Sequence, residues 1–201
     1  FLDFTLERLR QLGVDLVTLD EAIDRLRARS KPRPFAVLTF DDGYRDNLVH
    51  ALPILKKHGA PFTLYVPTAL VDGTGEIWWQ AIEDIIGGHS AISFEREGSL
   101  VRLGTETLMQ KQQAFDTLYW HMRKMPESER IMLVRQFAAA HGYDLTRQCR
   151  ELIMTWDELR SIAAEPLCTI GAHTVHHYEL AKLSSAQAAE EMARSADLLE
   201  E

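Results

Sequence analysis

Three short runs of apolar residues, separated by long stretches of mixed polarity, dominate the pattern of this chain. They occupy residues 35–40, 61–66 and 167–172. Runs of this length, rich in β-branched and aromatic residues, predict buried β-strands. The first run follows Pro32 and Pro34 and leads directly into Asp41 and Asp42, so two carboxylates stand where the predicted strand ends.

The segments between these runs have the spacing of apolar positions that is typical of amphipathic helices. One covers residues 46–58 and stops at Gly59, a residue suited to the left-handed end of a helix. Another begins at Thr155, which has Glu158 three positions later as in a capping box. A strand, a helix and a second strand in close succession predict a parallel βαβ unit, and therefore an α/β fold.

The middle of the chain loses this alternation and predicts a mainly helical insertion. A β-hairpin is expected at residues 92–102, followed by helices at 105–124 and 126–141. We therefore predict a main α/β domain formed by residues 1–71 and 151–201. Residues 72–150 are predicted to form a subdomain inserted between these two parts. Because the chain lacks an initial methionine and stops inside a predicted helix at Glu201, we expect it to continue further.

The amino-acid composition restricts the possible functions less than the pattern of apolar residues does. The net charge of −8 and the lack of a basic cluster argue against nucleic acid as a partner. No apolar stretch approaches the roughly 20 residues that span a bilayer. Cys149 and Cys168 do not form a CxxC pattern, so neither a zinc knuckle nor a disulfide framework is predicted. Localisation and oligomeric state stay open.

Residues of the kind that bind metals follow two of the predicted strands. Asp41 and Asp42 end one strand, and His173 and His177 lie in the HTVHH segment after another. The carboxyl ends of parallel strands share one face, so these groups can converge, and the i, i+4 spacing predicts that both histidines lie on one side of a helical turn. Two imidazoles and one carboxylate leave an open position on Zn²⁺, and the second carboxylate can then act as a base.

The same two segments carry a resemblance to a known family. TFDDG at residues 39–43 and HTVHH at 173–177 resemble the first two motifs of the NodB-homology polysaccharide deacetylases, carbohydrate esterase family 4. The order of the motifs and the surrounding sequence agree with that resemblance over residues 35–70 and 152–201. It implies a distorted (β/α) barrel with fewer than eight strands, incomplete at the C-terminus of this chain and interrupted by the insertion.

Roles for individual residues follow from the resemblance. It implies that Asp41 is the catalytic base, that Asp42, His173 and His177 are metal ligands, and that the hydroxyl of Thr174 braces the histidine segment. The cofactor would be a divalent metal, zinc first, with cobalt, nickel or manganese as alternatives. The reaction would be metal-dependent hydrolysis of acetyl groups on an N-acetylated polysaccharide, oligosaccharide or amino sugar. The family's catalytic acid would lie beyond this chain.

Four further residues admit two interpretations each. Tyr44 follows the first motif and can face the substrate, and Trp78 and Tyr65 can stack on a sugar, although such aromatic residues more often pack in a core. His176 can support the metal ligands or lie on the surface.

Two other classes of function stay open at this point. A non-sugar C–N (amide) hydrolase would use the same residues. A Mg²⁺-dependent phosphotransfer protein would instead place carboxylates alone around the phosphate, which the histidine segment disfavours.

Overall fold

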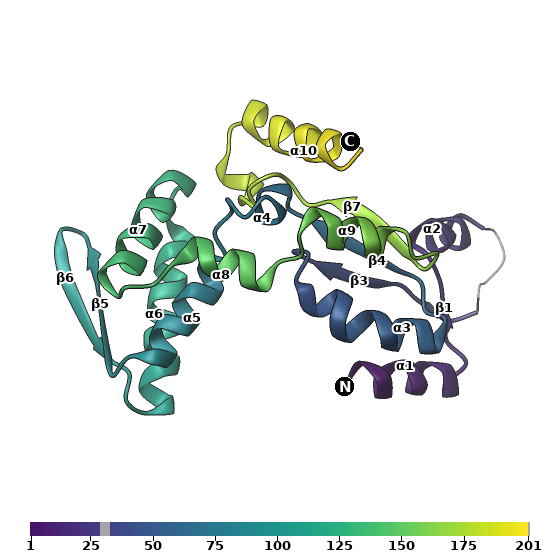
Figure 1. The fold of residues 1–201 in the computed structure, drawn as a ribbon, viewed down its shortest axis with the longest axis horizontal. Coiled ribbons are helices and arrows are strands. Elements are labelled where there is room, and N and C mark those ends of the chain that lie inside the picture. The colour runs from purple at the N-terminus through teal and green to yellow at the C-terminus, as the bar shows by residue number, and fades with distance from the viewer. Residues whose placement is uncertain (29–32, 201) are drawn as a thin grey trace. The chain divides into compact units, whose positions relative to one another are not determined.

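A computed structural model of the protein describes residues 1–28 and 33–200; Pro32 and Glu201 lie outside the described residues. Figure 1 shows the order of the elements, which is α1 (Leu2–Gln11), β1 (Asp15–Leu16), α2 (Leu19–Arg27), β2 (Phe35–Ala36), β3 (Leu38–Asp41), a π-helix (Asn47–Ala51), α3 (Leu52–His58), β4 (Phe62–Val66), α4 (Thr68–Val71), α5 (Trp78–Gly88), β5 (Ala91–Arg96), β6 (Ser99–Gly104), α6 (Leu108–Lys124), α7 (Glu127–Ala140), α8 (Leu145–Leu152), α9 (Trp156–Ala163), β7 (Cys168–Ala172), a 3₁₀-helix (Leu180–Lys182) and α10 (Ser185–Glu200).

The chain forms two compact units. The first consists of Phe1–Thr74, Leu152–His177 and Ala189–Glu201, and the second of Gly75–Glu151 and Tyr178–Ala188. The segment Tyr178–Ala188 therefore packs with the helical unit, whereas the sequence groups it with residues 151–201.

A three-stranded parallel sheet organises the first unit. Its order is β3–β4–β7, and β1 and β2 pair separately as a short parallel sheet. The strands of the described residues thus form open sheets and no closed barrel. β4 lies in the middle and is buried, but β3 and β7 are half-exposed. The prediction that all three strands are buried is therefore wrong for β3 and β7, because each lies at an edge of this sheet.

Helix ends in the first unit follow the local sequence. Gly59 adopts φ 56° and closes α3 with a left-handed residue, as predicted. Thr155 and Glu158 form both hydrogen bonds of the predicted capping box at the start of α9. α9 packs on β7, and α1 packs on α3 (Figure 1). These helices pack around the sheet, and the segments that follow the carboxyl ends of β3 and β7 are loops.

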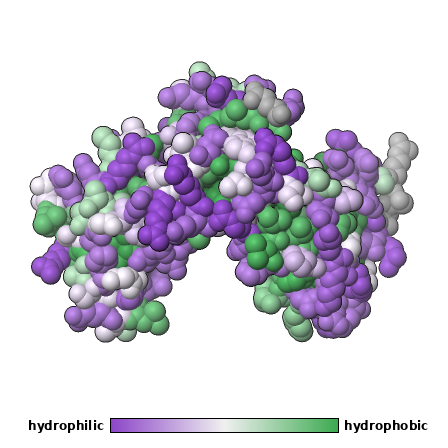
Figure 2. All heavy atoms as spheres, in the orientation of Figure 1, coloured by the Kyte–Doolittle hydropathy of each residue, from purple (hydrophilic) through white to green (hydrophobic). Residues whose placement is uncertain are grey.

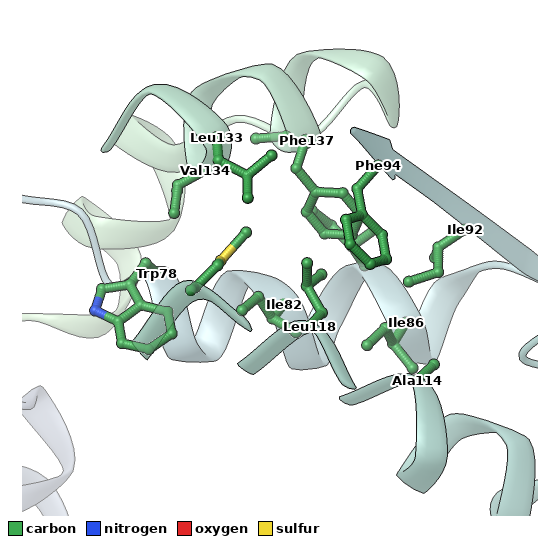
Figure 3. Packing of buried hydrophobic residues seen from close by; sticks show 13 residues of the cluster. Trp78, Ile82, Ile86, Ile92, Phe94, Ala114, Leu118, Leu133, Val134 and Phe137 are labelled. Atoms are coloured by element: carbon green, nitrogen blue, oxygen red, sulfur yellow. The ribbon is translucent and has the colours of Figure 1, made fainter. Parts of the chain in front are cut away.

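The second unit has its own hydrophobic core between a hairpin and three helices. β5 and β6 pair in antiparallel register around the turn at Glu97 and Gly98, both with positive φ, which confirms the predicted hairpin. Side chains of β5, α5, α6 and α7 point toward one another in Figure 3. The buried members are Trp78, Ile82, Ile85, Ile86, Ile92, Phe94, Ala114, Leu118, Met122, Leu133, Val134, Phe137 and Ala138.

Polar residues predominate on the face of the molecule that Figure 2 shows. In Figure 2 hydrophilic residues cover most of the visible face, and apolar residues lie among them in separate patches. Within residues 1–28 and 33–200, no helix has both the length and the apolar character needed to cross a membrane.

Candidate metal centre

The first motif places its two carboxylates in different environments. Asp41 is the last residue of β3 and is exposed. Asp42 and Gly43 both adopt φ 70°, so the chain turns sharply directly after the strand. A left-handed conformation is unusual for a residue with a Cβ atom and is often found at functional sites. The turn leaves the Asp42 side chain only 15% exposed, next to the segment that follows β7.

The histidine segment is not the predicted helical turn. His173 donates its backbone N–H to the carbonyl of Val66 at 3.2 Å, so the segment starts beside the end of β4. Thr174 and His177 then adopt positive φ angles of 68° and 58°. These two residues fold the segment into a tight loop that is not a helix, so the prediction of a helical turn is wrong. The hydroxyl of Thr174 accepts a hydrogen bond from the backbone N–H of His177 at 3.0 Å.

The two segments bring Asp42, His173 and His177 together. One ligand atom from each lies within 4.8 Å of the others. Asp42 Oδ1 is 3.3 Å from His177 Nε2 and 3.9 Å from His173 Nε2. The two imidazole rings have centroids 4.9 Å apart. The donor set is therefore two imidazole nitrogens and one carboxylate.

The electrostatics of Asp42 fit a cation at this place. Its Oδ1 atom is buried and accepts no hydrogen bond from the described residues, although buried carboxylate oxygens normally have donors. Burial raises the pKa of the Asp42 carboxyl, His177 and His173 lower it, and Asp41 adds to the rise. A bound divalent cation would satisfy the oxygen atom and offset the cost of burying its charge.

Of the other predicted residues, Tyr65 lies beside one of the ligands, and Tyr44 follows Asp42 by two positions in the chain. Tyr44 is half-buried and forms an isolated antiparallel bridge with Ile153. Tyr65 lies beside His173, with ring centroids 6.3 Å apart.

Trp78 is located elsewhere, because it belongs to the core of the second unit and is 5% exposed. Its indole stacks on Tyr119 at 5.2 Å, and the guanidinium of Arg130 lies 4.9 Å from the ring (Figure 3 shows Trp78 at one end of the cluster). An indole packed in this way presents no face to a sugar, so Trp78 has a packing role and the stacking interpretation is not supported.

Glu191 on α10 also contacts the histidine segment, and the sequence does not predict this contact. Its carboxylate accepts hydrogen bonds from the backbone N–H groups of Val175 and His176 at 3.0 and 2.9 Å, and it lies 2.6 Å from His176 Nδ1. Glu190 and Glu191 are adjacent in a polar stretch of helix. Such a pair predicts two solvated side chains, so the sequence contains no signal for this contact.

Comparison with known proteins decides the family. The sequence model described as polysaccharide deacetylase matches residues 28–201. The chain belongs to the polysaccharide deacetylase family. It has the mixed α/β fold of that family, with NodB homology, as the resemblance implies. No curated protein matches the chain significantly.

Three solved structures are similar to the chain at low identity. Deacetylase PplD of Streptococcus pyogenes, solved in complex with acetate, is 19% identical over 98% of this chain and 54% of that chain, with a TM-score of 0.47. The BpsB deacetylase domain of Bordetella bronchiseptica is 17% identical over 96% and 60%, with a TM-score of 0.47. IcaB of Ammonifex degensii is 22% identical over 96% and 57%, with a TM-score of 0.48. The chain therefore spans less than two thirds of each.

Proposed function

We propose that the protein is a metal-dependent hydrolase that removes acetyl groups from an N-acetylated sugar polymer. The observation that carries this proposal is the convergence of Asp42, His173 and His177 at the carboxyl ends of β3 and β7, the two strands that flank β4 in the parallel sheet. Membership of the polysaccharide deacetylase family supports the substrate class. The distorted, incomplete (β/α) barrel implied by the resemblance stays a prediction.

The proposed ligands are the Asp42 carboxylate and the Nε2 atoms of His173 and His177. Three protein ligands leave a coordination position open, as in catalytic rather than structural zinc sites. Two imidazoles and one carboxylate are a ligand set of catalytic zinc sites, so zinc is our first choice. Imidazole and carboxylate also suit cobalt, nickel and manganese, which stay as alternatives. When bound, such a cation supplies Lewis acidity, which makes water more nucleophilic near neutral pH and draws electrons from an acyl carbonyl.

Asp41 is the proposed general base. It ends β3 immediately before Asp42, and its exposure leaves the carboxylate accessible to water and substrate. As the water oxygen bonds to the acetyl carbon, a carboxylate oxygen of Asp41 accepts the water proton. Breaking of the carbon–nitrogen bond, with uptake of a proton by the nitrogen, then yields acetate and a free amine. A positioned general base contributes roughly 10²- to 10⁴-fold to such a reaction.

Acetate release from N-acetylglucosamine oligomers tests this proposal. Asp41→Asn should lower the rate by about 10²-fold or more, because the amide cannot accept the proton. Its metal content should equal that of the wild type. Asp46→Asn is the matched control, since Asp46 is exposed and caps no helix with its side chain.

Turnover by Asp41→Asn at the wild-type rate would show that the base assignment is wrong. Release of acetate only from small non-sugar amides would instead favour the amide-hydrolase alternative.

A further inference from the structure

Glu191 contacts the histidine loop from a helix that is far from it in sequence. Its Oε2 atom accepts from the N–H groups of Val175 and His176, and its Oε1 atom lies 2.6 Å from His176 Nδ1. The side chain of Glu191 is 12% exposed, whereas that of His176 is 47% exposed. A nearly buried carboxylate therefore bonds two consecutive backbone amides in the loop that joins the two histidine ligands.

Conformation of the loop explains why an anion fits there. Val175 and His176 lie between Thr174 and His177, the two residues with positive φ. Consecutive N–H groups in a loop of this kind converge on one side and form a concave site for an anion. Val175 is 8% exposed, so its N–H depends on a protein acceptor rather than on water. Glu191 supplies that acceptor.

The opposite side of the same peptide groups is fixed by α4. The carbonyl oxygen of Thr174 accepts from the N–H of Thr68 at 3.3 Å, and that of Val175 accepts from the N–H of Ala69 at 2.9 Å. α4 therefore holds the two peptide groups by their carbonyl oxygens, and Glu191 holds the N–H groups of Val175 and His176. Without Glu191 these peptide groups lose the hydrogen bonds to their N–H groups and keep those to α4, and the metal ligand that follows them directly is His177.

We propose that Glu191 is a positioning residue that sets the orientation of His177 for metal binding. This inference rests on the proposed function of the centre. His173 is fixed independently by its bond to Val66, so the effect falls on the second histidine ligand. Groups that hold metal ligands in place typically contribute 10- to 100-fold to metal affinity.

Two substitutions of Glu191, one that changes the length of the side chain and one that removes its charge, distinguish a positioning role from a general electrostatic role. Glu191→Asp keeps the charge but is one methylene shorter, so it cannot reach the two amides. Glu191→Gln keeps the length and one oxygen that accepts from both. Positioning therefore predicts weak metal binding for Glu191→Ala and Glu191→Asp and near-normal binding for Glu191→Gln. A general electrostatic role predicts the reverse order for Asp and Gln.

The experiment measures Zn²⁺ affinity by competition with a chromophoric chelator, together with the visible spectrum of the Co²⁺-loaded protein. Glu191→Ala and Glu191→Asp should bind Zn²⁺ about 10- to 100-fold more weakly and show an altered Co²⁺ spectrum. Glu191→Gln should remain within about threefold of the wild type. Glu190→Ala is the control on the exposed neighbour and should change neither quantity.

Hydrogen exchange separates this inference from the proposed function. In the metal-free protein, the amides of Val175 and His176 should be protected in the wild type and should lose protection in Glu191→Asp. Wild-type affinity in Glu191→Asp, or unchanged protection, would overturn the inference about Glu191. A wild-type protein that binds no Zn²⁺ would overturn the proposed centre, and the exchange result would still decide whether Glu191 holds the loop.

Discussion

Gly171 is the position where one added methyl group most sharply tests the packing beside the metal centre. It lies in β7, paired with Tyr65 of β4, and a Cβ atom there would come within 2.6 Å of both Cδ1 and Cε1 of the Tyr65 ring. Tyr65 in turn contacts the ring of His173. The Gly171→Ala substitution therefore forces the tyrosine ring to move relative to a proposed ligand.

The magnitude follows from these distances. Non-bonded carbon atoms pack at about 3.5–4.0 Å, so the ring of Tyr65 has to retreat by about 1 Å. Extra methyl groups that force such shifts typically cost about 1–3 kcal/mol of unfolding free energy. Because the φ angle of Gly171 is outside the left-handed region, alanine adds no backbone strain, and the cost comes from the clash with Tyr65.

Urea denaturation of a double-mutant cycle measures this cost. Gly171→Ala should destabilise the wild type by about 1–3 kcal/mol but should be nearly neutral in a Tyr65→Ala background. Gly88→Ala is the control, because a Cβ atom at Gly88 meets nothing within 4 Å. Equal destabilisation by Gly171→Ala in both backgrounds, or none in the wild type, would refute the assignment of the clash to Tyr65.

Three further predictions concern the core, the pH dependence of stability and the thiols. Leu118→Ala should lower the unfolding free energy by about 2–5 kcal/mol in denaturant titrations, because Leu118 is fully buried in the second unit. Arg45 holds the pKa of the Glu158 carboxyl below its usual 4.5, so the pair stabilises the fold above that pH and the stabilisation is lost as pH falls. Glu158→Gln should therefore flatten the acid side of the stability curve measured between pH 6 and pH 3. Burial raises the pKa of Cys149 and of Cys168 to about 11, so both should react with Ellman's reagent much more slowly in native than in urea-unfolded protein at pH 8.

Each of these outcomes has a clear contrary result. Leu118→Ala with wild-type stability would mean that the second unit tolerates a cavity in its core. If the stability of the Glu158→Gln protein depends on pH as that of the wild type does, the ion pair of Arg45 and Glu158 does not contribute to acid unfolding. Thiols that react equally fast in native and unfolded protein would contradict the burial of Cys149 and the partial burial of Cys168.

The sequence predicted that the two motifs follow parallel strands, because apolar runs and the polar residues after them are local signals. The run before Asp41 and the run before His173 each become a strand, and both strands pair with β4 in parallel. Placement of Asp42 at the same edge of the sheet as His173 and His177 then follows from strand direction. Helix caps at Gly59 and Thr155 were predictable for the same reason, since each depends on residues within one turn.

Features that depend on distant contacts or on unusual backbone were not predictable. The spacing of His173 and His177 suits a helix, and only the left-handed conformations of Thr174 and His177 produce the observed loop. The sequence around Trp78 does not tell whether its indole is exposed or buried. The packing of α5 against α6 and α7 buries it. Glu191 looks like its exposed neighbour until the fold of α10 places it beside the loop.

The metal content of the purified protein tests the central claim most directly. Elemental analysis after loading with Zn²⁺ and removal of the excess should give about one metal ion per chain for the wild type. His177→Ala should lose most of it, while His50→Ala, which changes an exposed histidine, should retain it. A His177→Ala protein that is folded and binds as much zinc as the wild type would contradict the assignment of Asp42, His173 and His177 as a metal centre.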